Sequence, residues 1–274
     1  MHNIYITDLD HTFLRSDLSI SEYTKEIWNS FSSHSILTIA TARTYKKSAQ
    51  LLKGVDINAP MILLDGALIA TMDKQIIDTK FISKDIADGI IDEGAKLGIY
   101  PFILSLKDKE LNEAFLHSSI LNDAQTEVLK RYAKDDNLKA YKNIRAMNDN
   151  FKVVYMGDEM LLRELEANLK AIYKDTLKYI LAPEAYVGCY FLTILHKDAD
   201  KSHGIKSVSE YVGFDLTKLT VFGDNHNDLG MFDLAFRAVA VANAQEEVKK
   251  RADVVLKHTN DEDAVAHYLK GKIS

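Results

Sequence analysis

The chain has 274 residues, of which 47% are hydrophobic, enough for a large core and for about two domains. Its 34 basic and 40 acidic residues give a net charge of −6, which argues against nucleic acid as a partner, because general affinity for it needs a basic surface. No apolar run approaches the roughly 20 residues of a membrane span, and the N-terminus does not have the pattern of a signal peptide. The single cysteine, Cys189, cannot form an internal disulfide, so we expect a cytoplasmic protein without membrane contact.

Strands and helices alternate along the first part of the chain. An apolar strand at Ile4–Thr7 comes first, and Ser21 can cap a helix that runs to about His34. The segments expected next are a strand at Ile36–Ala40, a helix at about Thr44–Lys53, a strand at Pro60–Leu64 and a hairpin formed by Leu68–Thr71 and Gln75–Asp78. This alternation predicts a parallel sheet with helices on both faces.

The rhythm changes near residue 83 and returns after Asp200. Between them we expect helices near 84–97 and 159–172 and strands at Tyr100–Ser105, Phe151–Met156, Leu177–Ala182 and Tyr186–His196. We therefore predict an α/β fold whose Rossmann-like, doubly wound core is discontinuous, at about 1–82 and 198–274. Residues 83–197 would form an inserted α+β domain.

Two carboxylates, Asp8 and Asp10, follow the first strand directly. The carboxyl ends of strands in an open α/β sheet are where ligands bind. Two acids this close are costly unless they share a cation or divide the chemistry, with one attacking phosphorus and the other handling a proton. A polar turn after a strand is the structural alternative for this motif alone.

A second acidic cluster follows the apolar strand Leu219–Phe222. Gly223 permits a tight turn, and Asp224 and Asp228 are four residues apart, so they share a face if a helix starts here. Helix capping would explain this cluster if it stood alone. Two acidic strand ends in one chain offer hard oxygen ligands that suit Mg²⁺.

Two further segments fit a phosphate site. Thr41 and Ala42 follow the second strand, where a hydroxyl and backbone N–H groups can hold phosphate oxygens. Arg43 beside them fits a substrate contact or a structural ion pair equally well. Lys201 opens a helical segment with a cation, although an isolated lysine usually lies on the surface.

These four segments, in this order, resemble the haloacid dehalogenase superfamily of phosphotransferases, and most closely its Cof-type sugar phosphatases. Residues 239–255 and Asp65-Gly66-Ala67 are similar to the same subgroup, so the resemblance covers the whole chain. The chain departs from the family pattern at three positions. His11 and Ala42 stand where glycine is usual, and Asp65 stands where asparagine is usual.

The resemblance implies roles for individual residues. Asp8 would be the nucleophile that forms an aspartyl-phosphate, and Asp10 the general acid and base. Mg²⁺ would be held by the Asp8 carboxylate, the Asp10 backbone carbonyl and Asp224, with Asp228 orienting metal-bound water. The expected phosphoryl ligands are the Leu9 N–H, Thr41, the Ala42 N–H, Lys201 and Asn227.

The favoured function is therefore an Mg²⁺-dependent phosphatase for small phosphorylated metabolites such as sugar phosphates. A phosphomutase of the phosphomannomutase type and a non-catalytic phosphate-binding regulator are the alternatives. The expected partner is a small phosphate ester, and the expected assembly is a monomer or weak dimer. The resemblance also implies that the inserted domain is a C2-type cap, which chooses the substrate.

Overall fold

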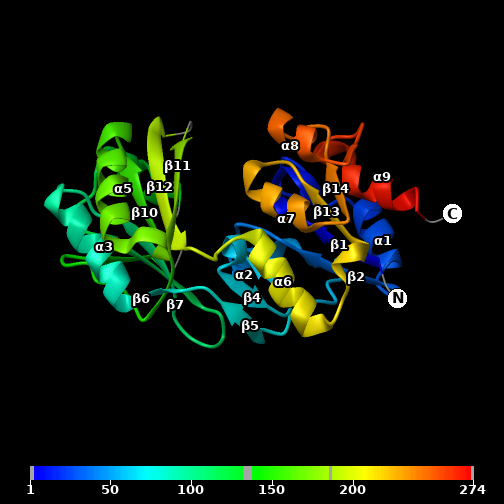
Figure 1. Cartoon of the computed structure of the whole chain (residues 1–274), viewed down its shortest axis with the longest axis horizontal. Coiled ribbons are helices and arrows are strands. Elements are labelled where there is room, and N and C mark those ends of the chain that lie inside the picture. The colour runs from blue at the N-terminus through cyan, green and yellow to red at the C-terminus, as the bar shows by residue number, and fades with distance from the viewer. Residues whose placement is uncertain (1–2, 132–137, 185–186, 273–274) are drawn as a thin grey trace. The chain divides into compact units, whose positions relative to one another are not determined.

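The computed structural model describes residues 3–131, 138–184 and 187–272 (Figure 1). The chain divides into two compact units. The second unit comprises Lys80–Asp198, and the first unit is formed by the residues before 80 and after 198. The second unit starts at residue 80 rather than at the expected 83. The reason is that β6 (Ile82–Ser83) pairs with β10 (Asp149–Gly157), a strand of the second unit's sheet.

A five-stranded parallel sheet forms the centre of the first unit, in the order β15-β14-β13-β1-β2. Its strands are β1 (Asn3–Thr7), β2 (Ser35–Ile39), β13 (Leu219–Gly223), β14 (Arg237–Ala240) and β15 (Val254–Val255). Thr7 pairs with Phe222 on one side and with Ile39 on the other. The carboxyl ends of β1, β2 and β13 therefore meet at one edge of the sheet.

Helices flank this sheet (Figure 1). They are α1 (Glu22–Ser30), α2 (Tyr45–Leu51), α6 (Lys201–Val212), α7 (Leu229–Leu234), α8 (Glu246–Arg251) and α9 (Ala264–Lys270). Ser21 caps α1 as expected, because its hydroxyl accepts a hydrogen bond from the Thr24 N–H. The helix ends at Ser30 instead of near His34, since the chain turns at Phe31, whose ring packs edge-on against Tyr5.

Both faces of the central strands are buried, which confirms the doubly wound α/β class. Ile4 and Ile6 belong to one apolar cluster together with Ile205 of α6. On the opposite face of β1, Tyr5 lies against the rings of Phe31 and Phe222. The sequence of a strand that is packed on both faces is a nearly continuous apolar run, and β1 has such a sequence.

A separate antiparallel sheet joins the same unit, formed by β3 (Met61–Leu63), β4 (Leu68–Ala70) and β5 (Ile76–Thr79). The predicted hairpin is thus present. Three successive residues between β3 and β4, Leu64, Asp65 and Gly66, have φ of 51°, 54° and 88°. A Cβ atom on Gly66 would lie 2.1 Å from the carbonyl oxygen of Asp200, so this position requires glycine.

The second unit is built on a mainly antiparallel sheet in the order β11-β12-β10-β7-β8-β9, with β6 on β10. Its remaining elements are α3 (Lys84–Lys96), β7 (Phe102–Leu106), β8 (Glu113–Ser118), α4 (Asp123–Arg131), β9 (Leu138–Tyr141), α5 (Glu159–Tyr173), β11 (Leu177–Glu184) and β12 (Cys189–His196). The sequence did not predict β8, α4 and β9. Tyr186, the expected start of the last strand, lies outside the described residues.

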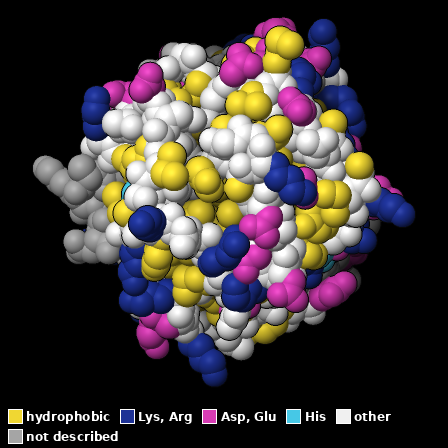
Figure 2. Space-filling model, turned by 90° about the vertical axis from the view of Figure 1, so that its left-hand side faces the viewer, with side chains coloured by type: hydrophobic (Ala, Val, Ile, Leu, Met, Phe, Trp, Pro, Cys, Tyr) yellow, Lys and Arg dark blue, Asp and Glu magenta, His cyan; other side chains and the backbone are white. Residues whose placement is uncertain are grey.

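The face drawn in Figure 2 carries basic and acidic side chains interspersed with hydrophobic ones. Within the described ranges, every helix is too short or too polar to traverse a lipid bilayer.

Candidate active site

The ends of β1 and β13 place two aspartates at one edge of the sheet. Asp8 leaves β1 in an extended conformation, and its N–H donates to the Phe222 carbonyl at 2.9 Å, which continues the parallel ladder by one residue. Its side chain is only 9% exposed. Asp224 follows β13 directly and is also buried.

A turn after β13 brings Asp228 back to Asp224. Oδ2 of Asp228 accepts hydrogen bonds from the backbone N–H groups of Asp224, at 2.8 Å, and Asn225, at 3.0 Å. A Cβ on Gly223 would lie 2.5 Å from this oxygen, so glycine is needed for the turn to close. The two aspartates do not share a helix face, because α7 begins only at Leu229, and the turn itself brings them together.

Carboxylate oxygens of Asp8, Asp224 and Asp228 lie within 4.8 Å of one another. In the part of the chain that the structure describes, this is the one group of acidic, histidine or cysteine side chains with such spacing. Thr12, which the sequence analysis did not select, donates to Oδ1 of Asp224 at 2.9 Å. The chain therefore gathers three buried carboxylates from two strand ends.

Lys201 lies among these carboxylates. It is the first residue of α6, is 1% exposed, and donates to Oδ1 of Asp8 at 2.5 Å and to Oδ1 of Asp228 at 2.6 Å. Asp200 caps the helix by accepting a hydrogen bond from the His203 N–H at 2.7 Å, which fixes where α6 starts.

The electrostatics show that one lysine does not neutralise the cluster. Burial raises the pKa of Asp8 well above its usual value, against the attraction of Lys201. Burial and, to a smaller extent, the negative charge of Asp228 raise the pKa of Asp224 to about 6. Burial lowers the pKa of Lys201, but the carboxylates of Asp228 and Asp8 outweigh it, so this pKa is raised and the ammonium group stays charged.

The donor set fits a divalent cation. Three carboxylates face one ammonium group, which leaves an excess of negative charge in a buried place. Asp228 uses both oxygens within the protein, whereas Oδ2 of Asp8 and Oδ2 of Asp224 have no hydrogen-bond partner among the described residues. Carboxylate oxygens are the ligands that Mg²⁺ prefers.

Asp10 lies outside this carboxylate cluster and pairs with Arg43. The guanidinium donates from Nε to Oδ2 at 2.8 Å and from Nη2 to Oδ1 at 2.5 Å. Such a two-point contact fixes the plane of a carboxylate. Of the two interpretations of Arg43, the structure thus contains the ion pair, and the ion pair joins the loops that follow β1 and β2.

The expected phosphoryl ligands all belong to the first unit. Leu9 begins the turn after Asp8, and Thr41 is buried, with its hydroxyl oxygen accepting from the Arg43 N–H at 3.2 Å. The structure gives the Ala42 N–H no acceptor in the ranges it describes. Asn227 is exposed and donates to Oδ1 of Asp65 at 3.0 Å.

Two of the three departures from the family pattern fall on left-handed backbone. His11 has φ 56° and Asp65 has φ 54°. Glycine and asparagine are the residues that adopt this conformation most readily, which accounts for their usual presence at these positions. The side chains of His11 and Asp65 are thus accommodated by the same backbone path, at a cost in conformational strain.

These observations define an α/β enzyme with a Rossmann-like core, an inserted α+β unit and a buried acidic site at the carboxyl edge of its parallel sheet. A model of the haloacid dehalogenase-like hydrolases matches residues 5–269, and the chain belongs to this family.

Curated relatives extend over nearly the whole chain. It is 26% identical to the 5-amino-6-(5-phospho-D-ribitylamino)uracil phosphatase YwtE of Bacillus subtilis over 283 aligned residues, which cover 97% of this chain and 96% of YwtE. It is 24% identical to the phosphatase YitU of the same organism, named for the same substrate, with 96% and 94% covered.

Solved structures share the complete fold. TM0651 from Thermotoga maritima superposes with a TM-score of 0.81 at 25% identity, covering 100% of this chain and 98% of that one. A haloacid dehalogenase-like hydrolase from Bacteroides thetaiotaomicron gives a TM-score of 0.80 at 22% identity, with 100% of both chains covered. The fold expected from the sequence is therefore confirmed across both units.

Proposed function

We propose that this chain is an Mg²⁺-dependent phosphatase that hydrolyses small phosphate monoesters, with sugar phosphates and related polyol phosphates as the substrate class. The main observation in support is the buried cluster of Asp8, Asp224 and Asp228, with Lys201 among them, at the carboxyl edge of the sheet. Relatives named as phosphatases of a phosphoribityl compound support this substrate class. The exposure of Asp10 supports its access to a leaving group.

In this mechanism Asp8 is the nucleophile. Its Oδ2, free of hydrogen bonds from described residues, forms a bond to phosphorus while the bond from phosphorus to the ester oxygen breaks. Lys201 holds the other oxygen of Asp8 and so fixes the direction of attack. For this step Asp10 is protonated and released from Arg43, and it gives its proton to the ester oxygen as that oxygen leaves. Asp10 then takes a proton from the water that hydrolyses the aspartyl-phosphate, and phosphate is released.

The cation would be held by Asp8, the Asp10 backbone carbonyl and Asp224, while Asp228 orients these ligands through its bonds to the turn. When bound, Mg²⁺ supplies positive charge that offsets the negative charge developing on the phosphoryl group. The Leu9 and Ala42 N–H groups, Thr41, Lys201 and Asn227 would hold the phosphoryl oxygens. Such positioning and charge stabilisation account for most of the catalysis of phosphoryl transfer.

The test is phosphate release from a panel of phosphorylated sugars and polyols with Mg²⁺ present. Asp8→Asn should abolish turnover, because an amide is a poor nucleophile. Asp56→Asn is the matched control, since Asp56 is an exposed aspartate of the same unit, and it should keep parent activity. A folded Asp8→Asn protein that keeps more than a few per cent of activity would contradict the proposal. Return of phosphate to the substrate instead of release would favour the phosphomutase.

A further inference from the structure

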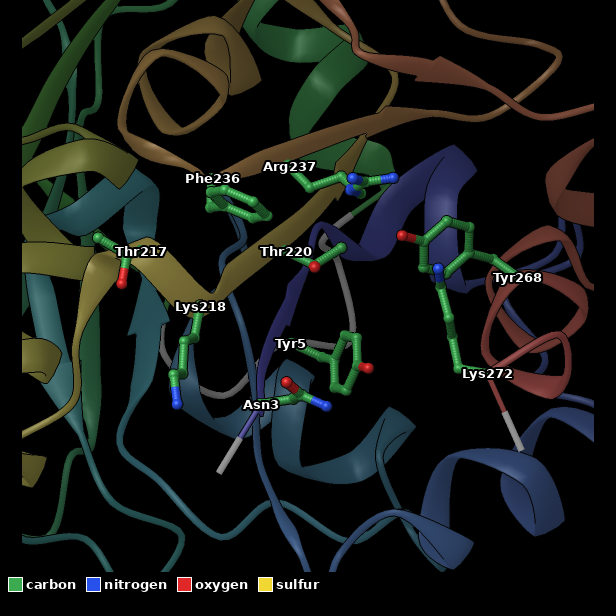
Figure 3. Close-up of a pocket in the computed structure, with 9 residues that line it drawn as sticks. All are labelled: Asn3, Tyr5, Thr217, Lys218, Thr220, Phe236, Arg237, Tyr268 and Lys272. Carbon is green, nitrogen blue, oxygen red and sulfur yellow. The ribbon is translucent and has the colours of Figure 1, made fainter. Parts of the chain in front are cut away.

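A second hollow lies in the first unit, at the opposite end of the same strands. It has a volume of about 310 Å³ and is lined by residues at the amino ends of β1, β13 and β14 and by the C-terminal helix region (Figure 3). Asn3 and Tyr5 come from β1, Thr220 from β13 and Arg237 from β14. The carboxyl ends of these strands carry the acidic site, so the length of the sheet separates the two places.

The lining is basic. Lys218, Arg237 and Lys272 contribute three cationic side chains, and no carboxylate belongs to the described lining. None of the three forms a salt bridge with any residue that the structure describes. The nearby Asp253 is engaged in another way, since it accepts a hydrogen bond from the Ala238 N–H at 2.8 Å. In a chain of net charge −6, this hollow gathers three cations, of which Lys218 also interacts with the carboxylate of Asp215 outside the lining.

A tyrosine forms one wall of the same hollow. Figure 3 shows the Tyr268 side chain turned toward Thr220 and Arg237. Its hydroxyl oxygen is buried and interacts with the side chains of Arg237 and Thr220. The hydroxyl thus helps to hold the Arg237 guanidinium in the wall of the hollow.

Aromatic side chains complete the lining. Phe236 is 64% exposed, a high fraction for so large an apolar group, and the Arg237 guanidinium lies 6.0 Å from its ring centre. The Lys272 ammonium lies 5.2 Å from the ring centre of Tyr268. Rings next to cations bind ligands that combine a flat, weakly polar part with an anionic group.

We propose that this hollow, formed around Lys218, Arg237, Tyr268 and Lys272, is a second binding site for a small anionic ligand of the nucleoside monophosphate class. The phosphate would accept bonds from the cations, among them the Arg237 guanidinium beside Tyr268, and the planar base would lie against Phe236. The volume is at the lower end of the range for small-molecule sites, which fits one nucleotide and excludes larger cofactors. This inference does not depend on the proposed catalytic function.

The experiment titrates adenosine 5′-monophosphate into the ¹⁵N-labelled protein, with chelator present so that no ester is hydrolysed. We expect saturable shifts of backbone amide signals in residues 217–220, 236–238 and 268 at ligand concentrations up to about 10 mM. Shifts confined to residues 8–12 and 223–228 would mean that the nucleotide binds only the acidic site, and would overturn the proposal. The absence of saturable shifts would do the same.

Variants separate charge from stacking. Replacing Lys218, Arg237 and Lys272 together should weaken binding roughly tenfold or more, because charge-assisted hydrogen bonds are lost. The control replaces Lys206, Lys250 and Lys257, which are exposed lysines of the same unit, and should leave affinity unchanged. Phe236→Ala should weaken binding of the nucleotide more than that of inorganic phosphate. Equal loss in the two triple variants, or no effect of Phe236→Ala on the nucleotide, would contradict the assignment.

Discussion

Replacement of Lys201 by methionine tests whether the lysine offsets the charge of the acidic cluster. Methionine fills the space of the apolar part of the lysine side chain and lacks only the charged nitrogen, so the variant introduces little cavity. Asp8 and Asp228 would then lose a hydrogen bond each, at 2.5 and 2.6 Å, while remaining 9% and 0% exposed. We expect the first unit to be strongly destabilised in the absence of metal.

The size of the effect follows from the burial of the ion pair. Removal of one partner from a buried pair costs roughly 3–5 kcal/mol, because the other charge stays buried and uncompensated. For a unit of this size, each kcal/mol lowers Tm by about 2–4 °C. Lys201→Met should therefore lower Tm by roughly 6–20 °C at pH 7.5. The deficit should shrink as the pH falls, since burial raises the pKa of Asp8 and an uncharged Asp8 no longer needs the lysine.

Thermal unfolding followed by circular dichroism in chelator provides the measurement. Lys206→Met is the control, because Lys206 lies on the same helix and is exposed. We expect it to change stability by no more than about 0.5 kcal/mol. If Lys201→Met lowers Tm no further than Lys206→Met at pH 7.5, the lysine does not stabilise the cluster and the reasoning is refuted.

Three other predictions concern metal, backbone and substrate. Mg²⁺ should raise Tm more at pH 7.5 than at pH 5, because Asp224, with a pKa of about 6, must lose its proton to bind the ion. Without Mg²⁺, the contribution of Asp224 to stability should fall as the pH rises from about 4 to 6. In this range the folded state keeps the proton on Asp224 and the unfolded state loses it. An equal shift at both pH values would argue against Asp224 as a ligand. Gly66→Ala should lose roughly 2–4 kcal/mol in denaturant unfolding, whereas Gly54→Ala, with a similar φ of 82° and no close neighbour, should lose only about 1–2 kcal/mol. Arg43→Gln should slow release of poor leaving groups more than of nitrophenol, because Asp10 loses its two-point support; equal slowing would exclude a role through the general acid.

The sequence predicts the parts of this fold whose signals are local. The apolar runs of β1 and β13 end directly in acidic residues, so their position at one sheet edge follows from the parallel arrangement. The polar flanks of β8 hide its alternation, and its pairing with β7 forms only in the folded sheet. The family resemblance, now confirmed by the match over residues 5–269, suggested roles that single residues could not indicate.

Contacts between loops could not be predicted in the same way. The pairing of Arg43 with Asp10 depends on β1 and β2 lying next to each other in register, which no spacing in the chain encodes. The contact of Thr12 with Asp224 likewise joins distant segments. The left-handed backbone at His11 and Asp65 could not be predicted either, because neither position holds the glycine or asparagine that most readily adopts this conformation.

The strand order has a consequence for how the chain folds during synthesis. β1 is made first, yet Ile4 must pair with Leu219, which leaves the ribosome only after the whole inserted unit. That unit contains every strand of its own sheet and can fold while the first sheet is incomplete. Until β13 is made, β1 exposes an unpaired edge and a largely apolar surface, so the nascent chain is most prone to aggregation in this interval.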